Sequence, residues 1–242
     1  MSMFPGSGAQ RKPWELEYGS YDRPMARFFN TVYAWMAVGL AVTAAVAYFV
    51  SQSQVGLQMV YGGGRAMWVV LLLGMFAISW GVQSAAMRIN ANVATGLFLL
   101  YSAMMGALLS GIFVVYKMQT IGGAFLMTAG TFGAMSVYGF VTKRDLTGIG
   151  SILVMAAIGL FLASIVNIFL ASNGLSWIIT YAVLAVFIGI TAYETQKLKV
   201  MASQFGSDPN MAPRIAIIGS LILYISFINL FTSILRIMGD RR

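Results

Sequence analysis

The chain has 242 residues, of which 59% are hydrophobic and only 9% are charged, whereas an ordinary soluble domain has about 25% charged residues. Because so few charged side chains cannot cover a soluble fold, this composition indicates a chain surrounded by lipid. Cys and His are absent, which excludes disulfides, thiolate nucleophiles and metal sites built on those ligands. The net charge of +8 comes from basic residues scattered through short segments, so we expect membrane lipid and no nucleic acid as a partner.

The N-terminal segment, 1–24, is polar and interrupted by Pro and Gly. It has no short apolar core with a cleavage site after a basic start, so it does not resemble a signal peptide. We predict that it is a cytoplasmic tail. The remaining residues, 25–242, then form one transmembrane domain.

Six long segments without Asp, Glu, Lys or Arg follow this tail. A helix needs about 20 apolar residues to cross the hydrocarbon core of a bilayer. The longest segment, 146–193, is long enough for two crossings and has turn residues at 172–174 near its middle. We therefore predict an all-α bundle of seven transmembrane helices, at 28–51, 66–85, 92–115, 121–141, 149–171, 176–196 and 214–237.

Small residues recur at four-residue spacing in most of these helices. In lipid, such rows allow two helices to approach closely. We predict that the rows form the helix contacts of a compact bundle. They are Ala37/Ala41/Ala45, Ala77/Gly81/Ala85, Ala103/Ala107/Gly111, Gly130/Ala134 and Gly159/Ala163.

The distribution of Lys and Arg favours a cytoplasmic N-terminus. With this orientation the cytoplasmic segments contain ten basic residues and the external segments contain five. The external set includes Arg236, Arg241 and Arg242, which oppose the rule. The side of the membrane on which the C-terminus lies is therefore left open.

One acidic residue stands at the end of a long apolar span. Six of the seven Asp and Glu residues fall in tails or loops, whereas Glu194 ends the predicted sixth helix. Ionisable groups at membrane depth are costly and often functional. Two interpretations stay open: Glu194 lies at headgroup level and pairs with Lys197, or it is a partly buried carboxylate that senses protons or binds a cation.

Three other residues are candidates to act with Glu194. Arg88 ends the second helix at about the same depth, and we predict an Arg88–Glu194 ion pair that acts as a latch; alternatively, Arg88 extends to lipid phosphate. Ser226 and Asn229 share one face of the seventh helix, where they either supply auxiliary oxygens or bond a neighbouring helix. We expect no tightly bound cofactor, with calcium as the candidate metal ion at Glu194.

Three motifs occur in order along the chain: 136–147 (SVYGFVTKRDLT), 191–197 (TAYETQK) and 227–231 (FINLF). Together with the seven spans, they resemble the Bax inhibitor-1 family, in its bacterial YccA-like branch, over nearly the whole chain after the tail. The resemblance implies a bundle whose last helix is surrounded by the others. It also implies a multi-pass protein of the bacterial inner membrane and a pH-sensitive calcium leak.

The resemblance also implies roles for individual residues. In the family, an acid at the end of helix six pairs with a second acid in helix seven, and an Arg of helix two engages the pair. Glu194 matches the first acid and Arg88 the Arg, but Ser226 stands where the second acid is expected. Two close carboxylates titrate as a coupled pair and offer calcium more charged oxygens than one. The pH-sensing device is therefore half present.

Two functional hypotheses follow. The first is a passive, pH-sensitive cation leak channel, with calcium as the ion, gated near Glu194. The second is a non-conducting regulatory membrane protein that modulates a membrane-bound protease or a stress response, as bacterial relatives are associated with such a role. We expect no enzymatic activity, because intramembrane proteolysis needs a Ser–His pair or two membrane acids.

Overall fold

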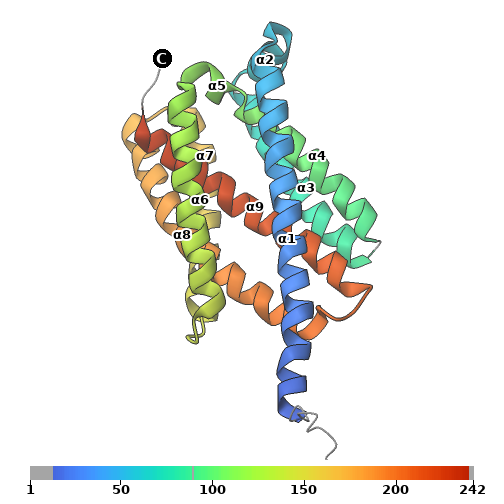
Figure 1. The fold of residues 1–242 in the computed structure, drawn as a ribbon. Helices are drawn as coiled ribbons and strands as arrows, with labels where there is room; N and C mark the ends of the chain where they lie inside the picture. The colour runs from blue at the N-terminus through green and yellow to red at the C-terminus, as the bar shows by residue number, and fades with distance from the viewer. Residues whose placement is uncertain (1–12, 89, 240–242) are drawn as a thin grey trace, which may run out of the picture.

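A computed structural model describes residues 13–88 and 90–239 of the chain, with side chains described in 24–64, 69–87 and 90–239. This part of the chain is built from helices (Figure 1). They are α1 (Pro13–Ser51), α2 (Gln54–Tyr61), α3 (Gly64–Arg88), α4 (Ala91–Leu109), α5 (Gly111–Val115), α6 (Met118–Val141), α7 (Thr147–Leu170), α8 (Asn173–Phe205) and α9 (Met211–Met238).

Seven spans within these helices are long and apolar enough to cross a membrane, which confirms the predicted number. The longest charge-free segment does contain two of them, because α7 ends at Leu170 and α8 begins at Asn173. Between them Ala171 adopts a left-handed conformation, with φ of 52°. Ser172 then caps α8 by accepting a hydrogen bond from the backbone N–H of Leu175.

Two helices extend well beyond their predicted limits. α1 begins at Pro13, inside the predicted tail, since Pro is well tolerated in the first turn of a helix. Residues 1–12 of that tail lie outside the described residues. α8 continues past Gln196 to Phe205. The predicted end of α8 was placed where the sequence stops being apolar, which indicates only where the chain leaves the membrane. The helix itself continues until its backbone hydrogen bonds end, at Phe205.

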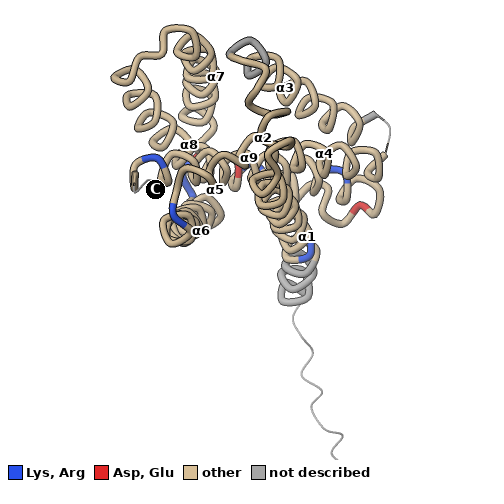
Figure 2. Tube along the Cα trace, turned by 90° about the horizontal axis from the view of Figure 1, so that it is seen from above, with Lys and Arg blue, Asp and Glu red and all other residues tan. Residues whose placement is uncertain are grey.

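The last helix, α9, is the central one, as the resemblance implies. It packs against α1, α3, α4, α6 and α8 and crosses α1 and α6 obliquely (Figure 1). In its most apolar segment 72% of the residues are buried, compared with at most 33% in any other span. α7 lies at the edge of the molecule, and charged residues are sparse along the described chain (Figure 2).

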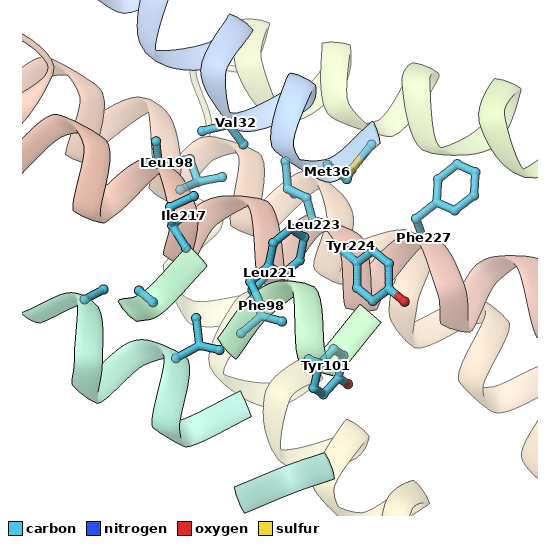
Figure 3. Packing of buried hydrophobic residues seen from close by; sticks show 14 of the residues in the cluster. Val32, Met36, Phe98, Tyr101, Leu198, Ile217, Leu221, Leu223, Tyr224 and Phe227 are labelled. Atoms are coloured by element: carbon cyan, nitrogen blue, oxygen red, sulfur yellow. The ribbon is translucent and has the colours of Figure 1, made fainter. Parts of the chain in front are cut away.

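Aromatic side chains surround the middle of α9. The buried ring of Tyr224 meets the rings of Phe98 and Tyr101 from α4 edge-on, with centroids 5.7 and 6.0 Å away (Figure 3). Phe227 packs in the same way against Phe132 of α6, at 5.5 Å. Because lipid tails are as apolar as these rings, the stabilisation comes from close packing and not from removal of the rings from water.

Candidate functional site

Glu194 is a buried carboxylate on α8. The residue is 6% exposed, and its Oε2 accepts no hydrogen bond from the described residues. The Nζ of Lys197 lies 3.8 Å from this oxygen, on a side chain that is 41% exposed. Such a long pair with an exposed partner is weak. The pairing with Lys197 and the burial of the carboxylate are both observed, whereas the level of Glu194 relative to the lipid headgroups stays a prediction.

The residues before Glu194 hold α8 tightly against α6 and α7. The backbone of Ala192 lies so close to Gly139 of α6 that a Cβ at Gly139 would come within 2.2 Å of the Ala192 carbonyl oxygen. The ring of Tyr193 covers Gly150 of α7, where a Cβ would again come within 2.2 Å of a ring carbon. These two contacts require glycine in α6 and α7.

The residues after Glu194 fasten the connection between α6 and α7. The Nε2 of Gln196 donates to the carbonyl of Arg144 at 2.7 Å, and its Oε1 accepts from the N–H of Leu146 at 2.8 Å. The Nζ of Lys199 donates to the carbonyl of Phe140, also at 2.8 Å. These bonds satisfy backbone groups in the last turn of α6 and in the connection to α7, which have no partner within a helix. Most of the contacts made by the motif 191–197 thus hold α8 against α6, α7 and their connection, and Glu194 is buried among these residues.

The central helix packs against α8 about one turn beyond Glu194. Leu198 of α8 lies directly over Gly219 of α9, because a Cβ at Gly219 would come within 2.6 Å of the Leu198 side chain. Glu194 lies about one turn before Leu198 on α8, and Ser226 lies about two turns after Gly219 on α9.

The other predicted site residues lie in different settings. Ser226 is 1% exposed and faces the interior of the bundle. Asn229 is half-buried, and its Nδ2 donates to the carbonyl of Ile225 in its own helix at 2.8 Å. Arg88 is the last residue of α3, and its side chain lies outside the described residues. The Arg88–Glu194 latch therefore stays a prediction.

Sequence reasoning misses a hydroxyl cluster where α1, α4 and α9 meet. The Oγ1 of Thr43 lies 2.9 Å from the carbonyl oxygens of Gly39 and Ser102 and 2.5 Å from the hydroxyl of Tyr224. Because the Thr43 hydroxyl has one proton, which goes to the carbonyls, the Tyr224 hydroxyl is the donor to Thr43. These residues are too far apart in the sequence for any local pattern to join them.

Comparisons with known proteins agree with this architecture. Residues 25–242 match the family model described as "Inhibitor of apoptosis-promoting Bax1". The chain is 45% identical over 216 residues to the inner membrane protein YbhL of Escherichia coli (strain K12), covering 89% of this chain and 92% of the relative. It is also 40% identical over 214 residues to an uncharacterized protein of Deinococcus radiodurans, covering 88% of this chain and 90% of that relative.

Proposed function

Because the chain belongs to the Bax inhibitor-1 family, we propose that it is a passive, pH-sensitive cation leak channel, with calcium as the ion. Its seven apolar spans and the inner membrane relative YbhL support the bacterial inner membrane as its location. The observation that carries the proposal is the buried Oε2 of Glu194, which has no hydrogen-bond donor among the described residues. A proton or a cation at this oxygen would offset the cost of that burial.

Glu194 acts as both gate and ligand in this proposal. When it is ionised it attracts a cation, for which Ser226 and Asn229 supply auxiliary oxygens. When it is protonated, its attraction to Lys197 and to the predicted counter-charge at Arg88 weakens. That local change in charge biases the packing of α8 against α9, and hence the opening of the bundle.

We also propose a cytoplasmic N-terminus. The bonds of Gln196 and Lys199 join the end of α8 to the connection between α6 and α7, which contains Lys143 and Arg144. A cavity between the start of α1 and the α8–α9 connection places Arg27 at the same end. This end of the bundle is rich in basic residues, which favours the cytoplasmic side.

Calcium flux into proteoliposomes tests the channel, with Ser226→Asp as the informative variant. A second carboxylate near Glu194 adds a charged oxygen for calcium and couples the two titrations. We expect wild type to conduct, and the variant to conduct more and to respond to pH over a different range. If neither protein conducts more than protein-free liposomes, the channel proposal is wrong.

The natural Ser226, which stands where the family resemblance implies a second acid, also favours a second candidate function. This candidate is a non-conducting protein that modulates a membrane-bound protease. A lone carboxylate offers calcium fewer charged oxygens than the pair implied by the family. Deletion of residues 1–12, which leaves α1 whole, separates the two functions. Loss of an effect on inner-membrane proteolysis, with flux unchanged, would favour the modulator.

A further inference from the structure

A polar cavity of about 410 Å³ opens at the end of the bundle opposite Glu194. It lies where α7 ends and α8 begins, beside the last turn of α9. A polar hollow is unexpected here, because the neighbouring surface of α7 and α8 is strongly apolar. Its polar lining comes from Ser164, Asn167, Ser172, Asn173, Ser176 and Arg236.

Hydrogen bonds within the wall give this cavity a defined shape. The Nδ2 of Asn167 donates to the Oγ of Ser176 at 3.0 Å, and its Oδ1 accepts from the N–H of Ser172 at 3.2 Å. Asn167 therefore ties the end of α7 to both the cap and the first turn of α8. The cavity belongs to a braced junction of two helices and not to a loose loop.

The charge of the cavity favours an anion. Arg236 contributes a guanidinium, and among the described residues that line the cavity none is acidic. The Cζ of Arg236 lies 5.9 Å from the ring centroid of Trp177 on α8, and this cation–π contact holds the guanidinium near the cavity. The first turn of α8 adds backbone N–H groups at Asn173 and Gly174, which have no acceptor within the helix. Arg side chains suit phosphate because their planar fork of donors matches its oxygens.

The surroundings of the cavity favour a lipid over a free anion as the source of a phosphate. Trp177 and Tyr181 stack with centroids 5.9 Å apart and are both exposed, as is typical of aromatic rings at the membrane–water interface. Leu170 and Ile178 expose 62% and 67% of their surface at the same level. Apolar surface for acyl chains therefore lies directly beside a cationic cavity.

We propose that this cavity binds the phosphate of an anionic phospholipid, with Arg236 as the main donor and Ser176 and Asn173 as secondary donors. The acyl chains lie over Leu170 and Ile178. Such a lipid joins the end of the central helix to the α7–α8 junction. The packing of α9 then depends on the composition of the bilayer.

Native mass spectrometry of the full chain in detergent, titrated with phosphatidylglycerol, tests the proposal. We expect Arg236→Gln to weaken binding at least about tenfold, which is about 1.4 kcal/mol. Arg214→Gln removes the same charge from the other end of α9 and should leave binding unchanged. Arg236→Lys should retain part of the affinity, which separates loss of the cation from loss of the fold.

Three results would overturn the proposal. Equal weakening by Arg236→Gln and Arg214→Gln would mean that net charge alone attracts the lipid. Displacement of phosphatidylglycerol by an equal concentration of inorganic phosphate would mean that the cavity takes the free anion. The third result combines two variants: Asp240→Asn strengthens the binding of phosphatidylglycerol tenfold, and Arg236→Gln leaves it unchanged. The partner of Arg236 would then be a carboxylate of the chain and not a lipid.

Discussion

Two neighbouring residues of α8, Glu194 and Gln196, are both polar but have opposite environments. Gln196 uses both ends of its amide on the α6–α7 connection, whereas Glu194 keeps one buried oxygen without a hydrogen bond from the described residues. A polar group with its partners in place stabilises the fold, and a buried group without them is costly. This contrast separates a structural residue from a functional candidate within a single motif.

Replacing Gln196 with Ala should loosen the α6–α7 connection. The change removes two hydrogen bonds from the backbone of Arg144 and Leu146, each of which contributes about 1 kcal/mol. We expect faster tryptic cleavage after Lys143 and Arg144 in detergent, and a lower melting temperature. Gln204→Ala, on an exposed face of the same helix, is the matched control. Equal cleavage of the two variants would contradict the conclusion that the hydrogen bonds of Gln196 hold the α6–α7 connection in place.

Asp208 should make the start of α9 sensitive to acid. Its Oδ1 accepts from the N–H groups of Met211 and Asn210, and these bonds hold the pKa of the carboxyl below its usual value. A carboxyl with a lowered pKa stabilises the fold above the pKa of the unfolded chain, about 3.9, and this contribution disappears as pH falls through the folded value. Asp208→Asn should therefore melt below wild type at neutral pH, and the difference should shrink below about pH 4. A difference that is constant with pH would contradict this assignment.

The helices themselves were predictable at the scale of elements, but the faces they use were not. Ala37, Ala41 and Ala45 form a regular row, yet all three are exposed, so the predicted contact of helix one is wrong. The close approach is made by Gly39, where a Cβ would come within 2.5 Å of the Phe98 ring. A four-residue spacing defines a face of a helix, but only the partner helix decides which face is buried.

Gly139 gives a direct test of the α6–α8 contact. Gly139→Ala places a methyl group against the carbonyl of Ala192 and must push the helices apart, at a cost of about 1–3 kcal/mol. Gly133→Ala on the same helix is the control, because a Cβ there would have no atom within 4 Å apart from its own turn of helix. We expect a lower melting temperature for Gly139→Ala only. A loss of the same size in both variants would show that helix packing is not the cause.

At the scale of the whole molecule, charge-free segments predicted seven spans, but not which helix is central. The central place of α9 came from the family resemblance, since most spans are similarly apolar. Two features depend on residues far apart in the sequence and could not be predicted: the Thr43–Tyr224 hydrogen bond and the cavity at Arg236. In the sequence, Arg236 stands out only as one of the external basic residues that oppose the charge rule for membrane orientation.

The proposed leak depends on a single carboxylate, and its pH response is the property that most directly reports on it. The measurement is calcium flux into proteoliposomes from acidic to neutral pH, comparing wild type with Glu194→Gln. Asp145→Asn is the control, because hydrogen bonds from Thr147 hold the pKa of this exposed carboxyl below its usual value. We predict that wild type and Asp145→Asn respond to pH in the same way, and that Glu194→Gln loses the response. An unchanged pH response in Glu194→Gln would contradict the assignment of Glu194 as the gate.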